Sequence, residues 1–88
     1  MMYKVVYSVR SVKVLGKMDK PAAAILYGWI EKNLVGCENP RIYGSALTGN
    51  IKGYWRYRVG SYRIIANILD NELQIEIINV GHRGEIYR

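Results

Sequence analysis

A strand with two contrasting faces, residues 54–59, is the feature that most constrains how this chain folds. Because side chains alternate along a strand, one face of this segment is cationic and the other is aromatic and aliphatic. The cationic face carries Tyr54, Arg56 and Arg58, and the opposite face carries Trp55, Tyr57 and Val59. Gly60-Ser61 then suits a two-residue hairpin turn. The segment predicts a sheet that is covered on one face and exposes arginines on the other.

Two further strands follow and complete a meander. The segments Tyr62–Leu69 and Glu72–Val80 flank Asp70-Asn71, which suits another two-residue turn. Apolar and polar side chains alternate from Leu73 to Ile77, as in an antiparallel strand with one buried face. Residues 2–8 also have strand periodicity. We therefore expect a three-stranded antiparallel meander that the N-terminal strand can join, which gives a small antiparallel sheet of about four strands.

The clearest helical pattern begins after Asp19, a good N-cap, with Pro21 in the first turn. Through Leu34 the apolar residues form a broad stripe that should be buried, made of Ala22, Ala23, Ile25, Leu26, Trp29, Ile30 and Leu34. Gly28 lies inside this helix at a cost of about 1 kcal/mol relative to alanine, which a close crossing with a neighbouring helix would explain. Gly36 suits a left-handed C-terminal cap.

Two segments have a less definite pattern. Residues 9–18 fit a strand by the propensity of their valines, or a short helix by spacing. Cys37–Asn50 is rich in turn formers and should be a loop with little regular structure. The whole pattern predicts an α+β fold with one or two helices on one sheet face.

Length and composition restrict the class of protein. We expect one domain, residues 1–88, and a net charge of +6 favours a polyanionic partner. No apolar run is long enough to span a bilayer, and no signal-peptide pattern is present. The single cysteine, Cys37, fits a reducing cytoplasm. One cysteine and one histidine leave no zinc-site spacing, and we expect no metal or cofactor.

From Leu47 onward the chain resembles the RelE/ParE superfamily of bacterial toxin–antitoxin toxins. The likeness is carried by Leu47-Thr48-Gly49, Tyr54-Trp55-Arg56-Tyr57-Arg58-Val59, Tyr62-Arg63-Ile64, Val80-Gly81-His82-Arg83 and Glu85-Ile86-Tyr87. Each piece is weak alone, but their order and spacing together are specific. The resemblance implies a small antiparallel sheet with a helical hairpin on one face, which makes residues 9–18 the first helix.

The resemblance also implies a function, through two branches of the superfamily. The RelE-like branch cuts messenger RNA in the ribosomal A site, whereas the ParE-like branch poisons DNA gyrase and lacks the cationic catalytic set. Carried over by position, the RelE-like set is Arg56, Arg58, Arg63, Arg83 and Tyr87. Because every position holds a cation or the tyrosine, the ribonuclease branch is favoured. The implied partners are the ribosome, mRNA and a RelB-like antitoxin, all in the cytoplasm.

Arginines suit this chemistry, because their planar donors match phosphate oxygens in pairs. A familiar RelE pattern has lysines where this chain has Arg56 and Arg58. Arginine does not deprotonate in proteins, so the general base is expected to be Tyr87 or His82. Neighbouring arginines would lower the pKa of Tyr87, whereas a free histidine already titrates near neutral pH. We expect further RNA contacts from Lys52, Arg41 and Arg88 to phosphates and from Tyr54 to a base.

Other interpretations of these residues compete with the catalytic one. The strand arginines could form a solvated face, His82 could be a turn residue, and Tyr87 could pack back onto the sheet. Two other functions also remain open. A gyrase inhibitor would not depend on Arg83 or Tyr87, and a basic binding module would tolerate Tyr87→Phe.

Overall fold

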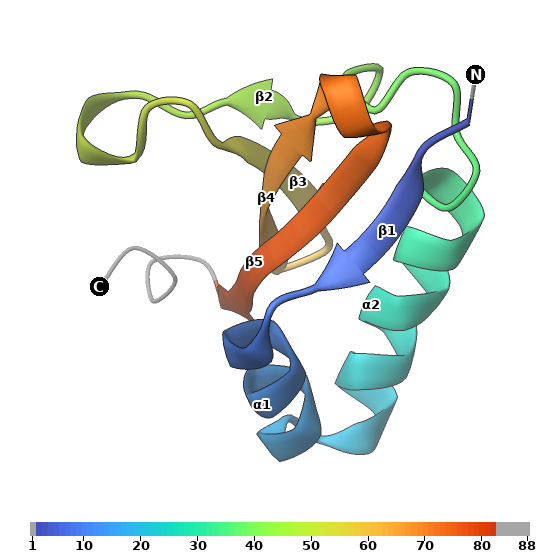
Figure 1. Ribbon diagram of the computed structural model, residues 1–88. Helices are drawn as coiled ribbons and strands as arrows, with labels where there is room; N and C mark the ends of the chain where they lie inside the picture. The colour runs from blue at the N-terminus through green and yellow to red at the C-terminus, as the bar shows by residue number, and fades with distance from the viewer. Residues whose placement is uncertain (1, 83–88) are drawn as a thin grey trace.

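The computed structural model describes residues 2–82 of the chain. Its elements are β1 (Lys4–Tyr7), α1 (Val9–Lys17), α2 (Lys20–Asn33), β2 (Ser45–Ala46), β3 (Trp55–Val59), β4 (Tyr62–Leu69) and β5 (Gln74–His82). Two 3₁₀ turns, Gly49–Ile51 and Asp70–Glu72, lie in the loops. The strands form one sheet in the order β1-β5-β4-β3-β2, with both helices packed on one side (Figure 1). The predicted α+β fold is confirmed.

The sheet is mixed and has five strands in the described chain, whereas the sequence predicted an antiparallel sheet of about four. β3, β4 and β5 form the expected antiparallel meander, but β1 pairs with β5 in parallel, with Val5 opposite Ile75. Alternation along a strand determines which side chains share a face, but it carries no information on the neighbouring strand or its direction. That is why the parallel pairing was not foreseen.

The fifth strand, β2, lies inside the segment predicted to be an irregular loop. Ser45 pairs with Arg56 and Ala46 with Trp55. The chain reaches this pairing through Gly44, which has a φ of +80°. A Cβ at this position would overlap the carbonyl oxygen of Arg56 and lie 2.8 Å from Trp55 Nε1. Only glycine allows this approach. In the sequence Gly44 indicated only a turn, but in the structure it lets β2 lie close enough to β3 to pair with it.

Residues 9–17 form helix α1, which resolves the ambiguity of that segment. Ser8 caps the helix, because its Oγ accepts a hydrogen bond from the Ser11 N–H at 3.1 Å. Ser11 and Leu15 are buried against the sheet, while Val9 and Val12 point outward. The strand propensity of the valines is therefore overridden by the cap and by the burial of one helix face.

Helix α2 begins where the sequence predicted, with the Asp19 carboxylate accepting from the Ala22 N–H. Gly36 has the expected left-handed conformation, with a φ of +75°. Two expectations about this helix are wrong. Ile25 is 60% exposed. Apart from the helix itself, no atom of residues 2–82 lies within 4 Å of a Cβ built on Gly28, so no other described helix crosses there. Neither helix in the described chain is long and apolar enough to cross a bilayer.

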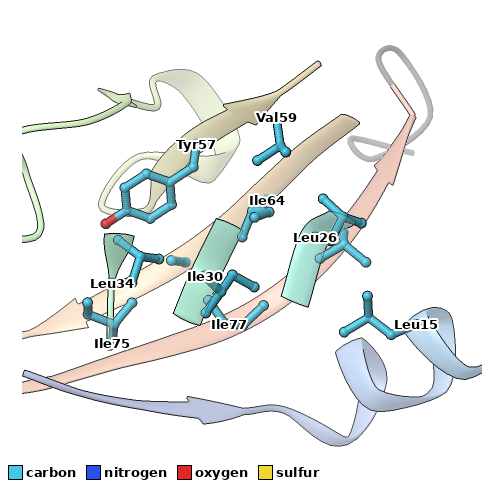
Figure 2. Packing of buried hydrophobic residues seen from close by; sticks show 11 residues of the cluster. Leu15, Leu26, Ile30, Leu34, Tyr57, Val59, Ile64, Ile75 and Ile77 are labelled. Carbon is cyan, nitrogen blue, oxygen red and sulfur yellow. The ribbon is translucent and has the colours of Figure 1, made fainter. Parts of the chain in front are cut away.

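The core lies between α2 and the sheet. Figure 2 shows Leu26, Ile30 and Leu34 of the helix facing the side chains of the central strands, including Ile64, Ile75 and Ile77. Tyr57 is fully buried, and its hydroxyl donates a 2.6 Å hydrogen bond to the Pro40 carbonyl. Burial raises the pKa of Tyr57. Trp29 and Trp55 pack at the margin of this cluster, so the predicted aromatic face of β3 is confirmed.

Strand β5 begins later than predicted. Leu69 pairs with Gln74, so the connection spans residues 70–73 rather than two residues. Leu73 adopts a left-handed conformation with a φ of +50°, and Asp70–Glu72 forms a 3₁₀ turn. Further along, the register slips, because Ile65 pairs with Asn79 whereas Ala66 pairs with Ile77. Ile78 is the extra residue of this bulge.

Candidate functional site

The helix-free face of β3 and β4 carries three arginines. Arg58 lies directly opposite Arg63 in the strand register, and Arg56, two residues earlier, lies opposite Ile65. Opposite residues of an antiparallel pair share a face, so the three side chains form one cationic surface, here called the arginine face. No acidic residue occurs between Asn39 and Leu69 to neutralise it. Like charges placed directly opposite repel one another, which favours an anion on this face.

The three arginines differ in their surroundings. Arg63 is 8% exposed, and its Nη1 donates to the Tyr62 carbonyl at 3.1 Å. Arg56 is half-buried, and its Nη2 donates to Ser45 Oγ at 3.0 Å. Arg58 is exposed and makes no hydrogen bond or ion pair within residues 2–82. Two of the guanidinium groups are thus held in position, while the third is available to an incoming anion.

A second, smaller apolar cluster borders the arginine face. Leu47 and Ile65 are buried together, with Ile51 and Ile78 packed against them. This contact covers part of the sheet face that was expected to be open. Beyond it, the segment between β2 and β3 projects away from the sheet (Figure 1). It carries Lys52 and Tyr54, two predicted RNA contacts, and both are exposed.

His82 lies on the other face of the sheet from the arginines. It pairs with Tyr62, and the two rings are 4.4 Å apart between centroids. Tyr62 packs against the main core on the helix side. His82 also lines a pocket of about 420 Å³ beside α1, together with Arg10 and Lys17. The structure therefore separates this candidate base from the arginines by the thickness of the sheet.

Arg41, another predicted RNA contact, is engaged with a carboxylate. Its Nη1 and Nη2 bind both oxygens of Asp70 at 3.0 and 2.9 Å, and the Tyr3 hydroxyl donates to Asp70 at 2.7 Å. Arg41 and then Tyr3 lower the pKa of Asp70, whereas the hydrogen bond to Asp70 raises the pKa of Tyr3. Arg41 also lies 5.9 Å from the Trp55 ring. This group ties the long loop to the β4–β5 turn, away from the arginine face.

Three of the predicted site residues, Arg83, Tyr87 and Arg88, lie outside the described residues. Within residues 2–82 no cluster of three or more His, Cys, Asp or Glu residues could hold a metal ion. The chemistry that the described part of this site offers is the binding of anions by guanidinium groups.

The structure also brings together residues that sequence reasoning did not connect with the arginines. Tyr43, Gly44 and Ser45 line a pocket with Arg56, Arg58 and Trp29. The only sequence signal for it was the concentration of turn formers in residues 37–50, which indicated a loop but not its contact with β3. Ser45 in particular gives no local sign of its hydrogen bond to an arginine eleven residues later.

Comparison with known proteins identifies the family. A family model described as "ParE toxin of type II toxin-antitoxin system, parDE" matches residues 5–87. The protein named Toxin RelE from Mycobacterium tuberculosis (strain ATCC 25618 / H37Rv) is 27% identical over 86 residues, which cover 98% of this chain and 87% of that protein.

Solved structures agree with this assignment at the level of the fold. The toxin–antitoxin complex RelBE2 from Mycobacterium tuberculosis contains a chain that is 24% identical, with a TM-score of 0.84, covering 94% of this chain and 100% of that one. The isolated RelE toxin of E. coli is 24% identical, with a TM-score of 0.72, covering 97% and 90%. Since the family model spans nearly the whole sequence, this chain belongs to the RelE/ParE superfamily of toxins from type II toxin–antitoxin systems.

Proposed function

We propose that this toxin is an endoribonuclease that cleaves messenger RNA in the ribosomal A site and so inhibits translation. The observation that carries the proposal is the arginine face. Arg58 is exposed across from Arg63, with Arg56 beside it on the same strand. Polyanionic RNA would neutralise this like-charge group, and guanidinium forks match phosphate oxygens in pairs.

The reaction would use the RNA's own 2′-hydroxyl. As the 2′ oxygen bonds to the adjacent phosphorus, its proton passes to a base, and the bond from phosphorus to the 5′ oxygen breaks as that oxygen gains a proton. The products are a 2′,3′-cyclic phosphate and a 5′-hydroxyl end. The phosphorane-like transition state carries extra negative charge, and positioned donors that stabilise such charge often make the largest contribution to catalysis.

The general base in this proposal is Tyr87 rather than His82. His82 packs against Tyr62 on the helix side of the sheet, and from there its imidazole has no direct path to a phosphate on the arginine face. A tyrosine ordinarily has a pKa of about 10, and nearby guanidinium groups would favour its phenolate. Arg83 supplies a further cation in the same scheme.

The proposal includes partners. In this proposal the ribosome presents the mRNA, because a domain this small offers little surface with which to read RNA sequence by itself. An antitoxin of the RelB type restrains the toxin, which the similarity to a chain of the RelBE2 complex supports. The basic net charge of +6 suits both ribosomal RNA and an acidic antitoxin. All of these partners belong to the cytoplasm.

A cell-free translation reaction with a defined message, mapped by primer extension, tests the proposal. We expect cleavage that requires ribosomes and is lost in Arg58→Gln and Tyr87→Phe. Arg10→Gln is the matched control, because it also removes one exposed positive charge but lies on α1. Absence of cleavage by the wild-type toxin would refute the nuclease function. Cleavage that persists in both site variants would refute the proposed site.

A second candidate function is inhibition of DNA gyrase, and one specific observation favours it. The family model that matches residues 5–87 is described for ParE toxins. A gyrase supercoiling assay with the purified toxin distinguishes the two. Inhibition of supercoiling that is unchanged by Tyr87→Phe, together with no ribosome-dependent cleavage, would establish this alternative instead.

A further inference from the structure

A pocket of about 440 Å³ opens at the edge of the sheet beside the arginine face. It exists because β2 pairs only with Trp55 and Arg56. Beyond that point, within residues 2–82, no strand covers this edge of β3 from Tyr57 to Val59. An uncovered strand edge presents main-chain donors and acceptors. The pocket thus lies where backbone polar groups, the arginines and the end of the long loop meet.

One wall of the pocket is aromatic and is held in place by neighbouring groups. Tyr43 is 43% exposed, and its carbonyl accepts a 2.7 Å hydrogen bond from Trp55 Nε1. The Trp29 ring meets the Tyr43 ring edge-on, with centroids 5.7 Å apart and an interplanar angle of 73°. Gly44, which must be glycine to approach β3, follows directly. The Tyr43 ring is therefore supported from behind while part of its surface stays accessible.

The pocket also has a cationic wall. Arg56 and Arg58 both line the pocket, and the hydrogen bond from Arg56 Nη2 to Ser45 Oγ fixes one guanidinium next to the loop. Arg58 has no partner in the described chain. A ligand that fits both walls needs an anionic group for the arginines and a flat ring for Tyr43.

We propose that this pocket binds one nucleotide of single-stranded RNA, with its phosphate at Arg58 and Arg56 and its base against Tyr43. This inference rests on the proposed ribonuclease function and adds a subsite to it. An acidic peptide would satisfy the arginines but would make no use of the exposed aromatic ring. A nucleotide uses both, and stacking on an aromatic side chain is the usual way in which proteins hold unpaired bases.

The two tryptophans provide a direct readout of binding. The chain contains only Trp29 and Trp55, so a ¹H–¹⁵N spectrum has two indole signals, one from a pocket residue and one from the residue that holds Tyr43. Uridine and adenosine 5′-monophosphates would be titrated into the purified toxin without ribosomes. Ribose 5-phosphate, which has the phosphate but no base, is the comparison ligand. We expect both nucleotides to shift the indole signals and to bind more tightly than ribose 5-phosphate.

Substitutions of Tyr43 and Arg58 test the contributions of the aromatic and cationic walls to binding one at a time. Tyr43→Ala should weaken nucleotide binding about 5- to 100-fold, the range found for loss of one base-stacking side chain, and should leave ribose 5-phosphate unaffected. Tyr43→Phe should bind as the wild type does. Arg58→Gln should weaken all three ligands. Tyr27→Ala is the matched control, because Tyr27 has a similar exposure of 39% but lies on α2 outside this pocket.

The results can overturn the inference independently of the nuclease proposal. Equal affinity for nucleotides and ribose 5-phosphate, or nucleotide binding that survives Tyr43→Ala, would refute it. So would a tetraglutamate peptide that shifts the indole signals when nucleotides do not. Tyr43-dependent nucleotide binding without ribosome-dependent cleavage would keep the subsite and refute the proposed function. Circular dichroism of each variant verifies the fold, and the Trp55 bond to the main chain of residue 43 does not need its side chain.

Discussion

Replacing Gly44 by alanine should destabilise this protein strongly, because that residue sits in a left-handed conformation against another strand. Its φ is +80°, and a Cβ would overlap the Arg56 carbonyl oxygen and lie 2.8 Å from Trp55 Nε1. A non-glycine residue in this region costs about 1–2 kcal/mol, and forcing atoms into a packed site costs about 1–3 kcal/mol more. The sum is about 2–5 kcal/mol, a large part of the stability of a small domain.

Two other glycines allow the cost of the backbone conformation to be measured apart from the cost of steric overlap. Gly49 has a φ of +68°, but within the described part of the chain nothing lies within 4 Å of its Cβ position, so Gly49→Ala should cost only the conformational term of about 1–2 kcal/mol. Gly28 is helical with open space around it, so Gly28→Ala should stabilise the protein by about 0.5–1 kcal/mol. The same chemical change is therefore expected to have three different effects.

Thermal unfolding followed by circular dichroism measures these differences. For a domain of this size each kcal/mol shifts the Tm by about 4–8 °C, so Gly44→Ala should lower the Tm by at least about 8 °C. A Tm for Gly44→Ala equal to that of Gly49→Ala would show that the close approach to β3 adds nothing. A Tm at or above the wild-type value would refute the reasoning altogether.

Four further outcomes are expected. Tyr57→Phe should lower stability by about 1–3 kcal/mol in urea unfolding, because it leaves the buried Pro40 carbonyl without its donor. Burial, and then Tyr27, raise the pKa of Tyr7 to about 12. The free energy of unfolding that Tyr7 contributes below pH 10 should therefore fall as the pH rises toward 12. Circular dichroism would follow unfolding, and tyrosinate absorbance would follow the ionisation. Arg41 and Tyr3 lower the pKa of Asp70. Because the Arg41–Asp70 pair is exposed, Asp70→Asn should lower the free energy of unfolding by at most about 1 kcal/mol above pH 4. Thermal melts at lower pH should show no difference between the variant and the wild type. Arg58→Gln should raise stability by about 0.2–1 kcal/mol at low salt, because it removes a like charge opposite Arg63, and added salt should shrink the gain.

The parts of the fold that were predicted correctly are those that depend on interactions between residues close together in the sequence. The Asp19 cap, the Gly36 left-handed residue and the Gly60-Ser61 hairpin each depend on a few neighbouring residues. The alternation in β3 correctly places Tyr57 in the core and Arg58 outside it. These features need no knowledge of which segments meet in space, and the arginine face follows from them directly.

The features that were missed all depend on contacts between distant segments. The two residues of β2 have no strand pattern of their own and are ordered by β3. Ile25 belongs to an apolar stripe wider than the sheet can cover, so its side chain stays exposed. Gly28 was expected to mark a helix crossing, but the described residues leave open space beside it. Arg41 carries a charge like the strand arginines, but its partner Asp70 is 29 residues away. Composition alone could not distinguish an engaged arginine from an available one.

The bulge at Ile78 decides the arrangement of the candidate site. Ile75 and Ile77 face the core, so strict alternation would turn residue 82 toward the arginine face. The extra residue reverses the alternation, which places Val80 in the core and His82 against Tyr62. It also sets Gly81, which has no side chain, directly across from Arg63. One inserted residue thus removes the imidazole from the arginine face and leaves room there for a guanidinium, so the ribonuclease that we propose would take its cations from this face and its proton acceptor from elsewhere in the chain.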